Sequence, residues 1–338
     1  MKHSVTRQKI AWCCITACLL LLQIASAAPF AAAQNREGVK KSSPREGQAR
    51  PAAQAKSSDT IIVNSDLVTF TVSVVDSNGR HVTGLESKDF KVFDNNLPQE
   101  IAFFSDADEP LSVGIIFDVS GSMSGQKIQR AREALSKFIE TSHPRDEYFL
   151  VGVGSKAELL MDRTRDSGAL LDKLSFVEAK GQTALYDAAY LGLEKVMRGI
   201  HPKRALIIIS DGQDNNSRYS FGQLSRFLKE SDVLIYAVGT PGPMFGNQLD
   251  VYGKLLLSEL ASSSGGSAFF PESGAEMMEA FERIALDLRH QYSIGYRPSN
   301  FVSDGKWHRV KVRVSPPAGS KRLFVRSREG YFATGSPD

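Results

Sequence analysis

The sequence predicts an α/β protein, with a doubly wound, mainly parallel sheet that carries helices on both faces and is flanked by an antiparallel β-sandwich. Along the middle of the chain, apolar runs as long as buried strands alternate with amphipathic helical patterns. Such alternation is typical of a parallel sheet covered by helices. At both ends of the chain, apolar and polar residues alternate one by one, which is typical of strands with one buried face.

The first 28 residues are predicted to be a secretory signal peptide. Three basic residues precede an apolar run from Ile10 to Ala28, and Ala25-Ser26-Ala27 resembles a small-residue cleavage site. Because the run approaches the roughly 20 residues needed to span a bilayer, an uncleaved membrane anchor is the alternative. We therefore expect a secreted, periplasmic or cell-envelope protein that contacts a membrane, if at all, through this leader.

All three cysteines lie inside the predicted leader, at Cys13, Cys14 and Cys18. The chain beyond it has no thiol, so disulfides, thiolate metal sites and cysteine nucleophiles are excluded there. Its stability must come from core burial, with a bound metal as a further contribution.

Residues 29–58 are predicted to be a disordered basic linker, since they contain almost no large apolar side chain. Residues 1–33 carry three basic and no acidic side chains, and residues 34–56 carry six basic and two acidic ones. The formal net charge of +3 therefore conceals a folded remainder with a net charge of −4. No nucleic-acid partner is expected from this balance.

Two β segments, 60–106 and 291–334, are predicted to build one immunoglobulin-like sandwich. In the first, Val68, Phe70, Val72 and Val74 alternate with polar residues, and short strands follow at Phe90–Phe93 and Ile101–Phe104. In the second, Tyr292, Ile294 and Tyr296 alternate, as do Val310, Val312 and Val314, and a last strand is expected at Leu323–Arg328. Neither segment is large enough for a core of its own, so we expect them to pack together. Two separate small β units are the alternative.

The region between them, residues 110–290, is predicted to be the α/β domain. Its expected strands are Leu111–Phe117, Tyr148–Val153, Leu206–Ile209 and Val233–Val238, with an antiparallel edge strand at Glu158–Met161. Its expected helices are Gln126–Glu140, Leu185–Met197, Phe221–Glu230, Val251–Ser262 and Ala275–His290. These patterns place the strands in one sheet with helices on both sides.

A cluster of oxygen-bearing side chains directly follows the buried strand Leu111–Phe117. It consists of Asp118, Ser120 and Ser122. Ligands in open α/β sheets bind where the strands end, and oxygen donors without thiol or imidazole suit a hard divalent cation. Further oxygen ligands should come from neighbouring loops, where Thr183 precedes a helix and Asp211 ends the run Leu206–Ser210.

The stretch Asp118-Val119-Ser120-Gly121-Ser122 resembles the Asp-x-Ser-x-Ser signature that begins the metal-ion-dependent adhesion site (MIDAS) of the von Willebrand factor A domain family. Thr183 and Asp211 match the remaining motifs, and the resemblance covers about residues 111–290. It implies a Rossmann-like domain of the exported bacterial kind. It further implies that Mg²⁺, or else Mn²⁺ or Ca²⁺, is bound by Asp118, Ser120, Ser122, Thr183 and Asp211.

The same resemblance implies a mode of action. The family pattern places the carboxylates largely behind water, so the cation stays electrophilic and keeps an open position for an Asp or Glu of a partner protein. We therefore expect a metal-dependent protein-binding or adhesion module. A structural scaffold of an envelope complex, with metal only stabilising the loops, is the alternative. The sequence gives no indication of the oligomeric state.

An enzyme is not expected. The sequence contains no Gly-x-Ser-x-Gly elbow and no phosphate-binding Gly-x-x-x-x-Gly-Lys-Ser/Thr loop. Its histidines are scattered without metal-pair spacing, and none stands near Ser120 in the motifs. An oxygen-only metal site without an identifiable base or nucleophile gives no catalytic residues.

Overall fold

The computed structural model describes residues 67–123, 125–178, 181–240, 248–300, 302–315 and 322–333. All of these belong to a unit that spans residues 62–338, separate from residues 1–61. The predicted signal peptide and linker lie outside the described residues. None of the helices within the described ranges has both the length and the apolar character needed to cross a membrane.

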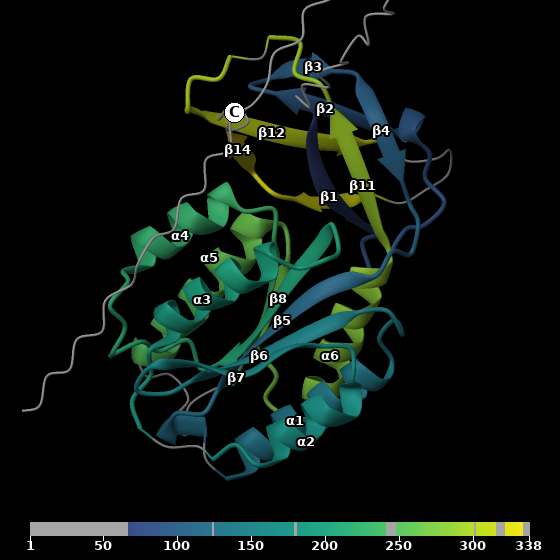
Figure 1. Ribbon diagram of the computed structural model, residues 1–338. Coiled ribbons are helices and arrows are strands. Elements are labelled where there is room, and N and C mark those ends of the chain that lie inside the picture. Colours follow the sequence, from purple (N-terminus) through teal and green to yellow (C-terminus); the bar gives the residue numbers. More distant parts are fainter. Residues whose placement is uncertain are drawn as a thin grey trace, which may run out of the picture. The chain divides into compact units, whose positions relative to one another are not determined.

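A six-stranded sheet in the order β10-β9-β8-β5-β6-β7 forms the centre of the α/β domain (Figure 1). Its strands are β5 (Leu111–Asp118), β6 (Glu147–Val153), β7 (Ala157–Thr164), β8 (Lys203–Ser210), β9 (Leu234–Gly239) and β10 (Ser267–Phe269). Neighbouring strands run parallel except β6 and β7, which are antiparallel. The structure thus confirms a mainly parallel sheet with an antiparallel edge strand.

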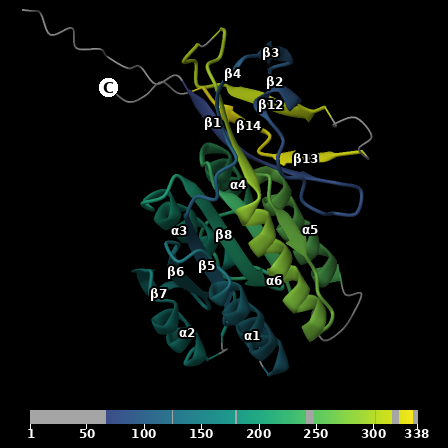
Figure 2. The same cartoon turned by 90° about the vertical axis from the view of Figure 1, so that its right-hand side faces the viewer.

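Helices cover both faces of this sheet, as predicted (Figures 1 and 2). One core cluster joins one face to α1 (Gln126–Glu140), α2 (Ser167–Ser175) and α6 (Gly274–Arg289). A second joins the opposite face to α3 (Leu185–Met197), α4 (Phe221–Glu230) and α5 (Gln248–Ser264). Since β5 lies between these layers in mid-sheet, all eight of its residues are buried.

The short elements α2 and β10 were not predicted. Helix α2 buries only Leu170 and Leu174, one turn apart, which is too short a pattern to distinguish a helix from a loop. Its start is fixed by the Asp166 carboxylate, which accepts a hydrogen bond from the Ala169 amide at 3.0 Å. Strand β10 has three residues and is defined by its pairing with β9, a contact that a local pattern does not reveal.

A β-sandwich of two four-stranded sheets is built from both ends of the described chain, in the strand orders β13-β1-β11-β4 and β14-β12-β2-β3. The strands are β1 (Val68–Val75), β2 (Phe90–Asp94), β3 (Leu97–Gln99), β4 (Ile101–Ser105), β11 (Gln291–Tyr296), β12 (Trp307–Val314), β13 (Phe324–Ser327) and β14 (Gly330–Phe332). Strand β1 pairs with β11, and β2 pairs with β12. One buried cluster contains residues of both sheets. The immunoglobulin-like character of this sandwich stays a prediction, and the three-residue strands β3 and β14 were not predicted.

A buried carboxylate, Asp94, ties the sandwich together. The hydroxyls of Tyr296 and Tyr331 each donate to its Oδ2 at 2.9 Å, and the His308 Nδ1 lies 3.0 Å from its Oδ1. These partners lie on three strands, β11, β12 and β14. Buried polar groups are tolerated only when they are paired, so Asp94 and its partners depend on each other.

We expect Asp94→Ala to lower the free energy of unfolding by about 3–5 kcal/mol, because it leaves two tyrosine hydroxyls and His308 without their acceptor. Urea unfolding monitored by circular dichroism measures this loss. Asp304→Ala is the control, since it removes only an exposed ion pair with Lys306 and an exposed hydrogen bond from the Lys306 amide, and should leave the midpoint almost unchanged. Equal midpoints for Asp94→Ala and wild type would show that the cluster does not stabilise the sandwich.

Helix α6 and the sandwich meet at a second buried carboxylate, Asp287, which is 2% exposed. It accepts hydrogen bonds from the Tyr236 hydroxyl at 2.9 Å and from the Arg326 guanidinium on β13 at 2.7 Å. The His81 Nδ1 lies 3.6 Å from its other oxygen. Burial lowers the pKa of His81; Asp287 opposes this shift, whereas Arg326 and His290 add to it.

A lowered His81 pKa makes stability depend on pH with a definite sign. As the pH falls below the unfolded value of about 6.5, the unfolded chain takes up a proton that folded His81 still excludes, so stability falls. We expect His81→Gln to lose the part of the pH dependence of stability that His81 causes. The free energy of unfolding should therefore fall less in the variant than in wild type between about pH 7.5 and about pH 5.5. Identical pH profiles in urea unfolding would contradict it.

Candidate metal centre

The candidate site lies at the carboxyl edge of the central sheet, where β5 and β8 end side by side. The two strands are parallel, with Phe117 opposite Ile209, so Asp118 and Ser210 end neighbouring strands. The loop after β5 contains Ser120 and Ser122, and Asp211 directly follows β8. The topology therefore brings two of the three predicted motifs to one edge.

Asp118 is fully buried, and both of its carboxylate oxygens are engaged. Oδ1 accepts a hydrogen bond from the Ser120 amide at 2.8 Å, and Oδ2 accepts one from the Ser210 hydroxyl at 2.6 Å. Burial raises the pKa of the Asp118 carboxyl to about 6; the two serines lower it, and the charge of Asp211 raises it further. The ionised form is thus disfavoured by burial, which a nearby cation would offset.

The loop after β5 presents two hydroxyls on a short 3₁₀ turn, η2 (Gly121–Met123). The Oγ atoms of Ser120 and Ser122 lie 3.0 Å apart. Ser120 is buried, whereas Ser122 is exposed. The pair therefore extends from the sheet edge to the protein surface, where a partner can reach it.

Thr183 lies in a loop that is tied to both of the others. The Gly121 amide donates to the Gly181 carbonyl at 3.2 Å, which joins this loop to the one after β5. The amides of Asn215 and Asn216 donate to the Thr183 carbonyl at 3.0 and 3.1 Å, which joins it to the loop after β8. The residue that caps α3 is Ala184, without a side-chain hydrogen bond. The Thr183 hydroxyl thus does not cap the helix, and no hydrogen bond to it is found in the described part of the chain.

Asp211 provides the observation that most directly favours a cation. Its Oδ1 accepts the Gln213 amide at 3.0 Å, but its Oδ2 is buried and has no hydrogen-bond partner among the described residues. An unpaired buried carboxylate oxygen is costly, and a bound cation would compensate it. The donor set consists of two carboxylates and three hydroxyls, which suits Mg²⁺ or Ca²⁺. No group of three or more His, Cys, Asp or Glu side chains in the described residues is arranged to hold a metal ion, so a cation here would depend on the hydroxyls as well.

Sequence reasoning missed Ser210. Its hydroxyl also accepts the Gly212 amide at 3.1 Å, so this one side chain holds the Asp118 carboxylate and the turn after β8. The available signal was a single polar residue at the end of the apolar run Leu206–Ile209. Three further polar side chains hold the loops around the site: Asn215 Oδ1 accepts the Thr183 amide, Asp214 accepts the Tyr186 amide, and Asp187 accepts two amides of the loop after β8.

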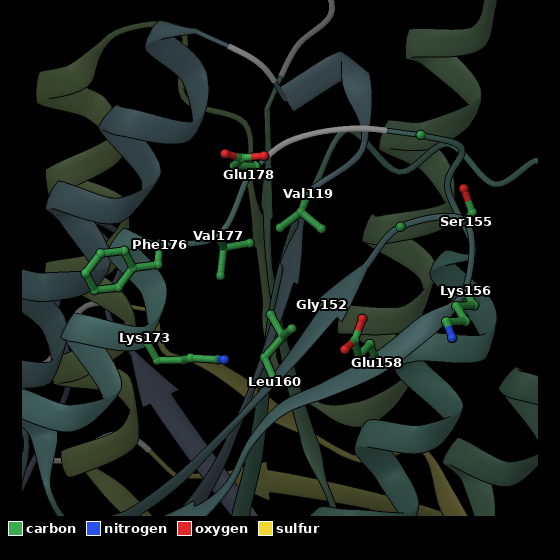
Figure 3. Close-up of a pocket in the computed structure, with 12 residues that line it drawn as sticks. Val119, Gly152, Ser155, Lys156, Glu158, Leu160, Lys173, Phe176, Val177 and Glu178 are labelled. Carbon is green, nitrogen blue, oxygen red and sulfur yellow. The ribbon is translucent and has the colours of Figure 1, made fainter.

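A pocket of about 430 Å³ adjoins this edge (Figure 3). Val119, which lies between Asp118 and Ser120, is one of its lining residues, and Gly181 is another. Its wall includes Leu160 and Val177, and Phe176 beside it is 83% exposed. The surface next to the candidate site is therefore concave and partly apolar.

Residues 113–213 match the family model of the von Willebrand factor type A domain. The chain contains a von Willebrand factor type A domain. The match includes all five predicted ligand positions. The family predicted from the motifs is confirmed.

Curated relatives include an uncharacterized protein of Synechocystis sp., sll0103, which is 22% identical over 52% of this chain and 41% of its own length. Human inter-alpha-trypsin inhibitor heavy chain H4 is 24% identical over 58% of this chain and 22% of its own length. The chain thus spans less than half the length of these relatives.

Similar solved structures include proximal thread matrix protein 1 from the mussel byssus with a zinc-occupied MIDAS motif. It is 18% identical, with a TM-score of 0.46 over 58% of this chain and 49% of that one. The vWF domain of the pili tip protein Mfa5 from Porphyromonas gingivalis is 14% identical, with a TM-score of 0.45 over 52% of this chain and 94% of that one.

The unpaired oxygen of Asp211 gives a prediction that separates metal binding from folding. We expect Asp211→Ala to unfold in EDTA at nearly the wild-type temperature, because the removal of a buried oxygen without a partner offsets the loss of the acceptor for the Gln213 amide. The free energy of unfolding of wild type should rise by about 2.7 kcal/mol at a Mg²⁺ concentration of about 100 times the dissociation constant. The free energy of unfolding of Asp211→Ala should rise by almost nothing. Thermal unfolding with and without Mg²⁺ measures both.

Ser210→Ala is the matched control. It leaves Asp118 Oδ2 without its donor and should lower stability in EDTA by about 1–3 kcal/mol, while much of the response to Mg²⁺ persists. Stabilisation of Asp211→Ala by Mg²⁺ to the wild-type extent would show that Asp211 does not bind the cation.

Proposed function

We propose that this chain is an exported protein-binding or adhesion module that takes an acidic side chain of a partner protein through a bound divalent cation. Asp118, Ser120, Ser122, Thr183 and Asp211 would hold the cation, with Mg²⁺ as the first candidate and Mn²⁺ or Ca²⁺ as alternatives. The observation that carries the proposal is the buried, unpaired Oδ2 of Asp211 beside the buried Asp118. We further propose that the chain is divided as predicted, into a leader (1–28), a linker (29–58), two β segments (60–106 and 291–334) and an α/β domain (110–290).

The chemistry follows from the donors. Neutral hydroxyls transfer little charge to a divalent cation, so when bound it supplies a Lewis-acid position for an anionic oxygen. The residues of the chain would hold the hydroxyls in place and leave one side of the cation free for a partner. Ser122 is exposed at the loop tip, so an incoming carboxylate would reach the site from that side.

The scaffold alternative assigns the metal only to loop stabilisation. The three loops are already joined by backbone hydrogen bonds, from Gly121 to Gly181 and from Asn215 and Asn216 to Thr183. These bonds need no cation, so the arrangement favours a binding role over a purely structural one.

Catalysis finds no support in the described side chains around the site. The histidines contact other groups: His308 lies beside Asp94, His81 beside Asp287, and the His201 Nε2 lies 2.9 Å from the Arg145 carbonyl. None of them is hydrogen-bonded to Ser120 or Ser122 in the described structure. Ser120 therefore lacks the base that a nucleophile requires.

Capture of proteins from an envelope extract by the immobilised chain tests the proposal. We expect capture in Mg²⁺, loss in EDTA and recovery when Mg²⁺ is restored, because the partner's carboxylate binds through the cation. Carbodiimide amidation of the extract's carboxylates should abolish capture. Asp118→Ala should abolish it too, with an unchanged circular dichroism spectrum, while Asp304→Ala should not.

Two outcomes would contradict this role. Tight capture that is unchanged in EDTA would refute a cation-dependent contact. Normal capture by Asp118→Ala together with a lowered melting temperature would favour the scaffold.

A further inference from the structure

The outward face of the sheet β14-β12-β2-β3 carries an uninterrupted group of cations. Along β12 the valines point into the sandwich core, while Arg309, Lys311 and Arg313 are exposed. Lys91 is exposed on the adjacent strand β2. We call these four side chains the basic face. Alternate residues of a strand lie about 6.7 Å apart on the same side, so three of the four cations form a straight row.

The strand register places two of these charges directly opposite each other. Lys91 pairs directly with Arg313 across the antiparallel strands β2 and β12. Like charges in this position destabilise a sheet, by up to about 1 kcal/mol. No ion pair is found for any of the four within the described ranges. Some other surface cations are paired, for example Arg226 with Glu230 and Arg283 with Glu279. The basic face therefore destabilises the fold, and folding alone does not explain why these four cations lie together.

Uncharged and aromatic residues flank the row. Opposite Phe93 lies Pro98 on β3, and opposite Arg309 lies Gly330 on β14. The Arg313 guanidinium lies 5.1 Å from the centre of the Phe93 ring. Phe93 itself lies opposite Lys311, in the middle of the row. At the end next to Arg309, the Trp307 ring packs edge-on against Phe332, with 5.0 Å between ring centres, and the Lys229 ammonium lies 5.7 Å from the centre of the Trp307 ring. An occupant would meet cations along the row, the Phe93 ring beside its middle and the Trp307 ring at one end.

A pocket of about 370 Å³ lies beside the row, between β12, β13 and the C-terminal end of α5. Arg309 and Lys311 line it together with Arg326 and Arg328, and Glu329 is the only acidic side chain among the residues that line it. Arg326 and Arg328 are already paired with Asp287 and Asp232. The unpaired cations are therefore those of β12, next to a hollow that can receive an elongated ligand.

We propose that the basic face binds an acidic polysaccharide. A linear row of cations matches a chain whose anionic groups repeat along its length, and guanidinium groups bind carboxylates in a two-pronged manner. The Phe93 ring beside the middle of the row and the Trp307 ring at one end can pack against the apolar sides of sugar rings. A flat anionic membrane fits less well, because the cations form one row rather than a broad patch. The folded remainder of the chain has a net charge of −4, so attraction is confined to this face.

The test uses polygalacturonate as the probe and the full chain in EDTA, so that the candidate metal centre does not contribute. Wild type should bind, and its affinity should fall at least about tenfold between about 50 and about 200 mM NaCl, since binding releases counterions. The variant Lys91→Gln/Arg309→Gln/Lys311→Gln/Arg313→Gln should lose binding at least about tenfold. The control Arg145→Gln/Arg163→Gln/Arg165→Gln/Arg198→Gln removes four exposed charges from the α/β domain and should bind as wild type does.

A single substitution separates binding from stability. Lys91→Glu places a carboxylate opposite Arg313, so its thermal midpoint should rise while affinity for polygalacturonate falls. Equal binding by the two four-residue variants, or no binding by wild type, would overturn the proposal. Stronger binding of wild type to phosphatidylglycerol vesicles or to single-stranded DNA than to polygalacturonate would also overturn it, in favour of that other polyanion.

Discussion

The burial of one carboxylate at the end of the central strand is the constraint around which the domain is arranged. Asp118 ends a strand in which every residue is buried, so water cannot solvate its charge. The Ser120 amide and the Ser210 hydroxyl replace part of that solvation and thereby fix the ends of β5 and β8 to each other. Asp211 adds a second carboxylate with an unpaired oxygen. The sheet edge is thus built with an excess of negative charge that the described protein groups do not neutralise.

The loops around this charge are held by the polypeptide itself. Backbone hydrogen bonds connect the loop of Thr183 to both neighbouring loops, and Asp187, Asp214 and Asn215 bind further amides there. A site whose ligands are held before binding loses little entropy when a cation or partner arrives. On the outer side of the cluster, Ser122 faces solvent. A contact that other molecules can reach needs both the hydrogen-bonded loops that hold the ligands and the exposed side at Ser122.

Sequence patterns could predict much of this fold because the decisive features are local. The helices α1, α3 and α4 begin and end at the predicted residues, since each has a long apolar stripe. Short elements such as α2 and β10 escaped prediction because their stability comes from contacts distant in sequence. The role of Ser210 escaped for the same reason: its partner Asp118 belongs to another strand. The basic face was not predicted because the net charge does not show where cations gather. The position of Lys91 opposite Arg313 also becomes visible only once the two strands are paired.

The place where the α/β domain joins the sandwich has a mechanical consequence. Strand β4 leads into the domain and β11 leads out of it, and these two strands pair with each other, with Ser105 opposite Ser293. Arg289 at the end of α6 also binds Asp108 at the entrance, at 3.0 Å. The domain is therefore inserted through a closed neck. A force that pulls the α/β domain away from the sandwich would load the pairing of β4 with β11, and the two ends of the domain would stay together as long as these strands remain paired.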